Sequence, residues 1–134
     1  MNAPGLASKL SAFGAKETMD RLEAALKVGG ATIFARIDHA AGAGSAGMEL
    51  RPTEVIVFGN PQGGTPLMQA EQTIGIDLPL KALVWQDAAG AVWLSYNEPA
   101  WLAERHGLGP QAAAAVAALT AMLRALAEKA TTAG

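Results

Sequence analysis

Apolar residues recur at helical spacing in two parts of the chain. Met19, Leu22 and Leu26 stand at i, i+3 and i+7, and the pattern ends at a pair of glycines, which predicts a helix over residues 17–30. A second run, built on Val116 and three leucines up to position 126, predicts a last helix over about 110–129. Each of these helices is expected to bury one face.

Alternating and β-branched runs predict five strands, at residues 8–13, 31–38, 54–58, 80–86 and 91–97. The last two are separated by four residues that end in Gly90, so they are expected to form a β-hairpin with Gly90 in the positive-φ turn position. In the second strand, Ile33, Ala35 and Ile37 are expected to share one face.

Proline and glycine positions predict the connections. Thr65 and Pro66 are typical of the start of a helix, which is expected to end near Gly75, and a second short helix is expected between Pro99 and Gly107. Residues 39–47 (HAAGAGSAG) contain three glycines and no large side chain, which predicts a loop with a helical turn.

The resulting order, β-α-β-β-α-β-β-α-α, predicts an α+β fold with a mainly antiparallel sheet and helices packed on one face, because a doubly wound fold needs regular βαβ alternation. We expect a single domain over residues 8–130, a flexible N-terminus (1–7) and a frayed C-terminal tail (131–134).

Composition excludes several classes of function. The 134 residues contain no cysteine and have a net charge of -2, which excludes thiol and iron–sulfur chemistry and disfavours nucleic acid as a partner. His39 and His106 lack the short spacing of a metal site, so we expect no metal and no cofactor. Without a secretory signal or a long apolar run, we expect a cytoplasmic protein that does not span a membrane.

Several motifs, in this order along residues 18–126, resemble those of the family called domain of unknown function 302. They are RIDH (36–39), LRP (50–52), FGNP (58–61), GIDLPLK (75–81), YNEP (96–99) and RH (105–106). The resemblance implies a compact α+β domain of the TATA-binding-protein-like group with a β-α-β4-α core and a tendency to dimerise, but no established reaction. One departure is the glycine-rich segment 40–47, where the family usually has a polar helix.

Two sites at predicted strand ends stand out. His39 follows Asp38 at the end of a strand, where it could act as a general base, an anion contact or a metal ligand. The structural alternative is that it caps the following turn or bonds to backbone at the strand end. Asn60, Gly63 and Gly64 lie between a buried strand and a helix, as phosphate-binding loops do, although the lysine of a nucleotide P-loop is missing and a purely structural turn is the alternative.

Other features have structural and functional interpretations. Asp77 and Lys81 could form a surface ion pair or belong to the same site. Trp85 and Trp93 of the predicted hairpin would mark an interface or an aromatic pocket if both are exposed. The alanine-rich last helix could pack on the sheet or mediate a dimer contact.

We therefore hypothesise a homodimeric module that binds a small molecule or a protein partner without catalysis, with His39, Asn60, Gly63, Gly64, Asp77 and Lys81 as candidate ligand-binding residues. The alternative is a small enzyme with His39 as the general base, acting on an anionic substrate held by the Gly63–Gly64 backbone. A third hypothesis is a purely structural subunit of an assembly.

Overall fold

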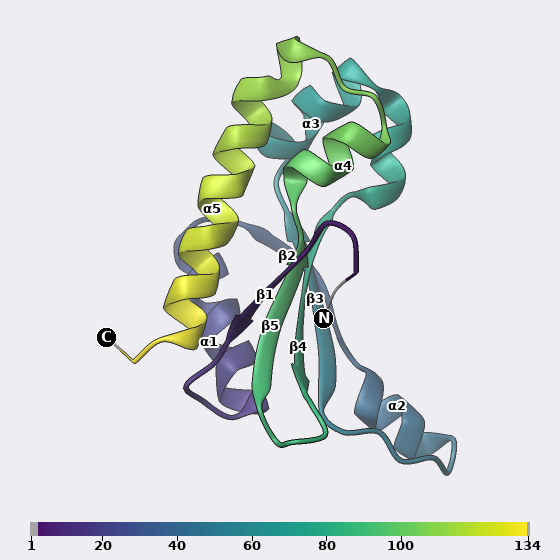
Figure 1. Ribbon diagram of the computed structural model, residues 1–134, viewed down its shortest axis with the longest axis vertical. Helices are drawn as coiled ribbons and strands as arrows, with labels where there is room; N and C mark the ends of the chain where they lie inside the picture. The colour runs from purple at the N-terminus through teal and green to yellow at the C-terminus, as the bar shows by residue number, and fades with distance from the viewer. Residues whose placement is uncertain (1–2, 134) are drawn as a thin grey trace.

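The computed structural model describes residues 3–133 and contains one five-stranded sheet (Figure 1). In the order in which they lie side by side, its strands are β1 (Leu6–Leu10), β5 (Val92–Asn97), β4 (Leu80–Gln86), β3 (Thr53–Gly59) and β2 (Thr32–Asp38). All neighbouring strands are antiparallel. The predicted α+β class with a mainly antiparallel sheet is confirmed.

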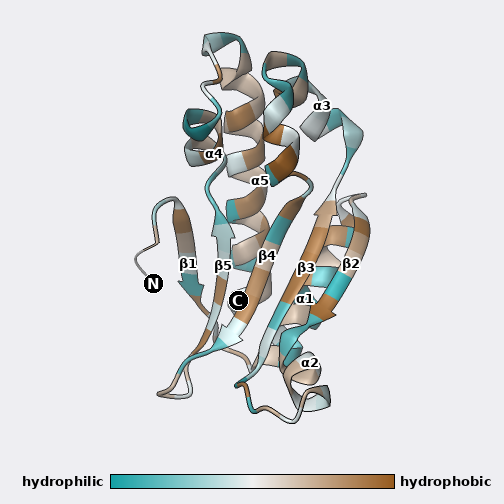
Figure 2. Cartoon of the chain, turned by 90° about the vertical axis from the view of Figure 1, so that its right-hand side faces the viewer, coloured by the Kyte–Doolittle hydropathy of each residue, from teal (hydrophilic) through white to brown (hydrophobic). Residues whose placement is uncertain are grey.

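Helices cover one face and the two ends of the sheet. The long helices α1 (Ala15–Val28) and α5 (Ala113–Thr131) lie on the same face (Figure 1). Beyond the end of β3 lie α3 (Pro61–Ala70), the 3-10 helix η1 (Gln72–Asp77), α4 (Pro99–Arg105) and the 3-10 turn η2 (Pro110–Ala112), and α2 (His39–Ser45) is at the opposite end. The other face of the sheet, turned toward the viewer in Figure 2, carries no helix.

The core lies between the sheet and the two long helices. Alternate strand residues point into it, among them Ile56, Val84 and Leu94, each at most 1% exposed. The three apolar positions of α1 identified from their spacing are buried against them. Each such large side chain contributes about 1.5–3 kcal/mol when it is removed from water.

The β-hairpin predicted from the sequence is confirmed. β4 and β5 pair in register, and Gly90 has a φ of 89°. The Asp87 carboxylate accepts hydrogen bonds from the backbone N–H groups of Ala89 and Ala91, at 3.0 and 2.9 Å, which holds the turn. The carboxylate also accepts a bond from the Trp93 indole, and these bonds together keep the pKa of Asp87 below its ordinary value.

The helix expected to begin at Pro66 begins five residues earlier. Asn60 is its N-cap and Pro61 its first residue, so Pro66 lies inside the helix rather than at its start. Pro66 has no N–H to donate to the preceding turn, and the short helix tolerates the loss of one bond. The helix was expected to end near Gly75, but α3 ends at Ala70. The region around Gly75 forms the separate 3-10 helix η1.

Three further expectations need correction. The first strand ends at Leu10 rather than reaching residue 13. In β2, Ile33 pairs with Phe58 of the core, whereas Ala35 and Ile37 point to the opposite face, because the register shifts at a β-bulge between positions 33 and 35. Residues 39–45 form the short helix α2, so the helical part of the predicted loop with a helical turn spans most of the segment, and the Asp38 carboxylate accepts a hydrogen bond from the N–H of Ala41 at 2.9 Å.

The ends of the domain differ slightly from the expected boundaries. β1 begins at Leu6, within the segment 1–7 that was expected to be flexible, and Thr131 is a buried residue of α5 rather than part of a frayed tail. Residues 1–2 and 134 lie outside the described residues.

Within the described chain, one helix is long and apolar enough to cross a membrane by length and composition alone. It is the segment Pro110–Thr131, with a hydropathy of 1.3. Leu119, Leu123 and Ala127 of this segment belong to the core of the domain. In all, 22% of the apolar window of this helix is buried inside the domain.

Candidate ligand-binding site

The chain turns sharply between β3 and α3, and Asn60 holds the turn. Its side-chain Oδ1 accepts a hydrogen bond from the N–H of Gly63 at 2.7 Å, and its carbonyl oxygen accepts one from the N–H of Gly64 at 3.2 Å. Pro61 occupies the first helical position, where no donor is needed. Both glycine N–H groups are used within the turn, so the free backbone donors expected for an anion are not available there.

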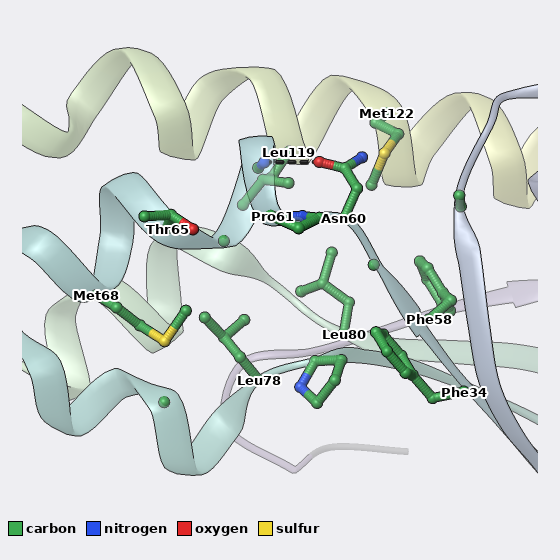
Figure 3. Close-up of a pocket in the computed structure, with 16 residues that line it drawn as sticks. Phe34, Phe58, Asn60, Pro61, Thr65, Met68, Leu78, Leu80, Leu119 and Met122 are labelled. Carbon is green, nitrogen blue, oxygen red and sulfur yellow. Dashed lines mark hydrogen bonds between the residues drawn. The ribbon is translucent and has the colours of Figure 1, made fainter.

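An apolar cavity of about 320 Å³ lies beside this turn (Figure 3). The buried side chains of Phe58 and Leu80 line its inner side, and Leu119 and Met122 of α5 close another side. The other lining residues come from β2 and its approach, the β3–α3 turn, α3, η1 and the chain before β4: Ala31, Phe34, Gly59, Asn60, Pro61, Gly63, Gly64, Thr65, Met68, Gly75, Leu78 and Pro79.

Glycines in the cavity wall leave much of this space open. A Cβ atom at Gly64 would be 3.7 Å from Leu78 Cδ1 and 3.8 Å from the Met68 methyl group, which is ordinary van der Waals contact. A Cβ atom at Gly63 would be only 3.3 Å from Leu119 Cδ2. A larger side chain at position 64 would therefore fill the cavity without a backbone clash.

The lining of this cavity has few polar side chains. Asn60 and Thr65 supply the polar side chains among its lining residues, and none of those residues is titratable. The amide nitrogen of Asn60 makes no hydrogen bond within residues 3–133, so it is free to donate to a bound molecule. An apolar molecule with one hydrogen-bond acceptor fits such a lining.

A polar cluster lies next to the cavity, around the Asp77 carboxylate at the end of η1. Asp77 Oδ2 is 2.6 Å from His106 Nε2 and also accepts a bond from Arg105. Burial raises the pKa of Asp77, but the hydrogen bonds from His106 and Arg105 lower it more, so the net pKa is below its ordinary value. His106 Nδ1 lies 3.1 Å from the exposed Thr73 hydroxyl, so the imidazole bridges a carboxylate and a hydroxyl.

This cluster joins η1 to α4. The Thr73 hydroxyl also donates to Glu71 at 3.1 Å, so its one proton cannot serve both partners at once. A histidine between a carboxylate and a hydroxyl can transfer a proton, but no lining residue of the cavity belongs to this cluster. The cluster is centred on Asp77, which lies in the chain between two lining residues of the cavity, Gly75 and Leu78.

Lys81 does not form the expected ion pair with Asp77. Its Nζ donates to the carbonyl oxygen of Pro79 at 3.0 Å and lies 3.5 Å from the Asp77 carbonyl oxygen, while the Asp77 carboxylate is occupied by its two other partners. Lys81 lies outside the cavity, because it alternates with Leu80 along β4 and points to the other face of the sheet.

His39 lies at the opposite end of the sheet from Asn60, which corrects the expectation of one shared pocket. β2 and β3 are antiparallel, with Thr32 opposite Gly59 and Asp38 opposite Glu54, so the end of β2 is remote from the end of β3. His39 is exposed, and the neighbouring Asp38 carboxylate caps α2 instead of holding the imidazole.

A second recess, lined by charged residues, lies between α1 and the end of β2. Its Arg36 guanidinium contacts three carboxylates: Glu54 at 2.8 Å, Asp20 at 2.9 Å and Glu23 at 3.3 Å. These contacts neutralise the cation, so the recess offers little attraction to an anion. Across residues 3–133, no group of three or more His, Asp or Glu side chains could hold a metal ion.

The sequence identified the turn of the candidate site but not its walls. Asn60, Gly63 and Gly64 line the cavity, whereas Phe34, Met68 and Met122 were not identified. The density of glycine between positions 59 and 75 was the one signal of open space in this region.

Comparison with known proteins identifies the family. The model of the family "Domain of unknown function DUF302" matches residues 7–126. The chain belongs to the DUF302 family. A solved DUF302 structure, an uncharacterised conserved protein from Bacillus stearothermophilus, has the same fold: the TM-score is 0.84 at 22% identity, over 96% of this chain and 99% of that one.

Curated relatives contain a similar DUF302 sequence within a longer chain. Proteins from Brucella suis and Brucella abortus, each named fluoride-specific ion channel FluC 1, are 51% identical over 115 residues, which is 86% of this chain. A Brucella melitensis protein named fluoride-specific ion channel FluC 2 matches equally well. This chain covers less than half of the length of these relatives, 43–45%.

Proposed function

We propose that this DUF302 protein is a non-catalytic homodimeric module that binds a small, mostly apolar molecule in the cavity beside Asn60, Gly63 and Gly64. The cavity itself carries the proposal, because apolar side chains from the sheet, α3 and α5 line it and polar side chains are few. Its volume of about 320 Å³ is at the lower end of the range of about 300–1,000 Å³ for ligand pockets.

The lining favours a neutral ligand over an anion. No lining residue carries a positive charge, and the N–H groups of Gly63 and Gly64 already donate to Asn60. An anion placed there would lose its hydration without a compensating charge, which is costly. We therefore expect an aromatic ring or a short acyl chain with one acceptor near the free amide nitrogen of Asn60.

The lack of titratable groups in the lining supports binding without catalysis, because general acid–base chemistry needs such a group within hydrogen-bond reach of the substrate. The occurrence of a similar sequence within longer relatives supports a module that works beside a further segment of the same chain in those proteins. The names of those relatives describe proteins more than twice as long as the shared segment, and we propose no ion conduction for this chain.

The test is a fluorescence titration with N-phenyl-1-naphthylamine, a neutral apolar probe. We expect saturable binding by the wild type and by Gly42→Leu, a matched control at a helical glycine with open space around it. Gly64→Leu should weaken probe binding at least tenfold because its side chain enters the cavity, and Gly64→Ala should weaken it less. Native mass spectrometry of untagged protein would reveal a retained ligand.

Equal probe binding by Gly64→Leu and the wild type would refute the cavity as the binding site. Because Gly64→Leu could also act by unfolding, the melting temperature of each variant is measured by circular dichroism. Gly64→Ala keeps the test decisive, since its Cβ meets only ordinary contacts.

A further inference from the structure

We propose that the uncovered face of the sheet binds a second copy of this chain, so that the two sheets pack face to face around a two-fold axis. We define the open face by Ile37, Val55, Val57, Leu83, Trp85 and Trp93, which point away from α1 and α5. This inference rests on the homodimer of the proposed function and is independent of the ligand cavity.

Strand alternation shows that the sheet is apolar on both faces. Val55 pairs with Leu83 and Trp85 with Trp93, and these residues alternate with the core residues of the same strands. An antiparallel sheet with one solvated face normally carries polar side chains there. The apolar open face is instead typical of a sheet covered on both sides. Figure 2 views the sheet from this side, which carries no helix.

The polar atoms on the open face are already satisfied within the chain. The Trp85 indole N–H donates to the Ser95 hydroxyl and the Trp93 indole N–H to the Asp87 carboxylate, both at 2.9 Å. Among the strand residues of the described chain, Lys81 is the ionisable residue on this face, and its ammonium group donates a hydrogen bond to the Pro79 carbonyl oxygen. The stacked rings of Trp85 and Trp93, 6.4 Å apart, can therefore be covered at a small desolvation cost.

The size of the open face suits a homodimer. The whole face of the five-stranded sheet, with strands about 4.8 Å apart and about six residues long, measures roughly 20 by 20 Å, and the residues of the open face lie on four of its strands. With the relief of its side chains, such a patch buries on the order of 600–800 Å² per subunit, close to the 800 Å² or so of a stable complex. β4 is the central strand, so a two-fold axis through the patch centre brings the two Leu83 residues near each other.

A second copy also explains the exposed apolar residues beside the patch. α2 and the chain after it project from the sheet on the side away from α1 and α5 (Figure 1). We call residues 39–51 the arm. Met48 and Leu50 of the arm are 67% and 48% exposed. A partner seated on the open face would lie against the arm, and the two-fold axis would make this contact twice.

The face carries almost no charge, and this favours a second copy over a charged partner. An uncharged apolar patch is complementary to itself, whereas docking of a strongly charged partner needs opposite charges on the receiving surface. α5 offers the competing dimer surface, because its outward side is lined mainly by small alanines.

The test measures molar mass by sedimentation equilibrium across protein concentrations, using the full chain. We expect the wild type to have twice the monomer mass of 13.7 kDa. Leu83→Glu and Val55→Glu place like charges across the two-fold axis and should raise the dimer dissociation constant at least 100-fold. Ala125→Glu, on the exposed side of α5, should leave it unchanged.

The outcomes separate this inference from the proposed function. The open face is refuted as the dimer interface if the wild type is a dimer and its Leu83→Glu and Val55→Glu variants stay dimeric. It is also refuted if the Ala125→Glu variant alone dissociates. In both cases the homodimer itself is retained. A wild type that is monomeric at 100 µM overturns the homodimer itself, while probe binding to the cavity would still be judged by the Gly64 variants. Both glutamates replace outward-facing, half-buried residues, and circular dichroism verifies that the variants are folded.

Discussion

Replacing Arg36 by methionine should destabilise the domain more than the loss of an ordinary surface ion pair. Arg36 lies on β2, and its guanidinium binds both carboxylate oxygens of Glu54 on β3, at 2.8 and 3.1 Å. It also contacts Asp20 and Glu23 of α1. Methionine keeps the unbranched apolar stem of the side chain but leaves three carboxylates near one another without their shared cation.

The size of the effect follows from burial of the pair. The side chains of Arg36 and Glu54 are 23% and 21% exposed, so their pair is intermediate between a surface and a buried ion pair. Exposed pairs contribute about 0–1 kcal/mol, and breaking a buried pair costs about 3–5 kcal/mol. We expect a loss of about 2 kcal/mol at pH 7, which lowers the melting temperature by roughly 6–8 °C for a domain of this size.

The effect should depend on pH in a defined direction. Lys16 and Arg36 lower the pKa of Asp20, and Lys27 and Arg36 lower that of Glu23, from ordinary values of 3.8 and 4.5. A lowered folded-state pKa contributes stability that is complete above the unfolded pKa and is lost as the pH falls through the folded pKa. The difference between wild type and Arg36→Met should therefore shrink below about pH 4.

Urea denaturation at pH 7 and pH 3 measures both effects. Lys16→Met is the matched control, because the Lys16 side chain is 85% exposed in its pair with Asp20, and it should cost less than about 0.5 kcal/mol. A loss below 0.5 kcal/mol for Arg36→Met at pH 7, or an equal loss at pH 7 and pH 3, would refute the reasoning.

Two further predictions concern the close contact of Gly5 with Trp101 and the polar cluster around Asp77. Gly5 and Gly47 have φ values of 74° and 75°, but a Cβ atom at Gly5 would overlap the Trp101 ring whereas nothing is near Gly47. Gly47→Ala should cost about 1 kcal/mol for its backbone conformation and Gly5→Ala at least about 2 kcal/mol more, as thermal melts can check, and equal losses would contradict the clash. Asp77→Asn should cost about 1–2 kcal/mol at pH 7, since the 18% exposed Asp77 carboxylate accepts charge-assisted bonds. Because the folded pKa of Asp77 is lowered from its ordinary value of 3.8, this loss should begin to shrink as the pH falls below about 4 and should vanish only below the folded pKa. An equal loss at pH 7 and pH 3 in urea denaturation would contradict this.

Sequence patterns predicted those elements whose structure depends on residues near one another in the chain. The hairpin around Gly90 depends on a short turn and two adjacent strands, and α1 depends on a regular apolar stripe, so both were predicted. The bulge in β2 was not, because the shift between positions 33 and 35 is set by pairing with β3 rather than by any residue in β2. Two competing signals, Asn60-Pro61 and Thr65-Pro66, could start α3, and the capping bond of Asn60 to Gly63 selects the first.

The sequence predicted only those residues of the candidate site that lie close together along the chain. Asn60 and Gly64 belong to one turn, whereas Leu119 and Met122 reach the cavity from α5, about 60 residues later. Amphipathic spacing shows that α5 buries a face but does not show which element receives it. His39 and Asn60 both follow strands, but the strands are antiparallel, and antiparallel neighbours end at opposite edges of the sheet.

The cavity and the open face share β4 but not its side chains. Leu80 lines the cavity, and Leu83 points to the opposite side of the same strand. Coupling between two sites requires an element with two arrangements that both sites bias. β4 is hydrogen-bonded to neighbours on both edges, which leaves it no second register at low cost. We therefore expect N-phenyl-1-naphthylamine to change the dimer dissociation constant by less than about threefold, whereas allosteric coupling of typical size gives about 5–150-fold. Sedimentation equilibrium with and without the probe decides this, and a tenfold shift would show that occupation of the cavity does reach the open face.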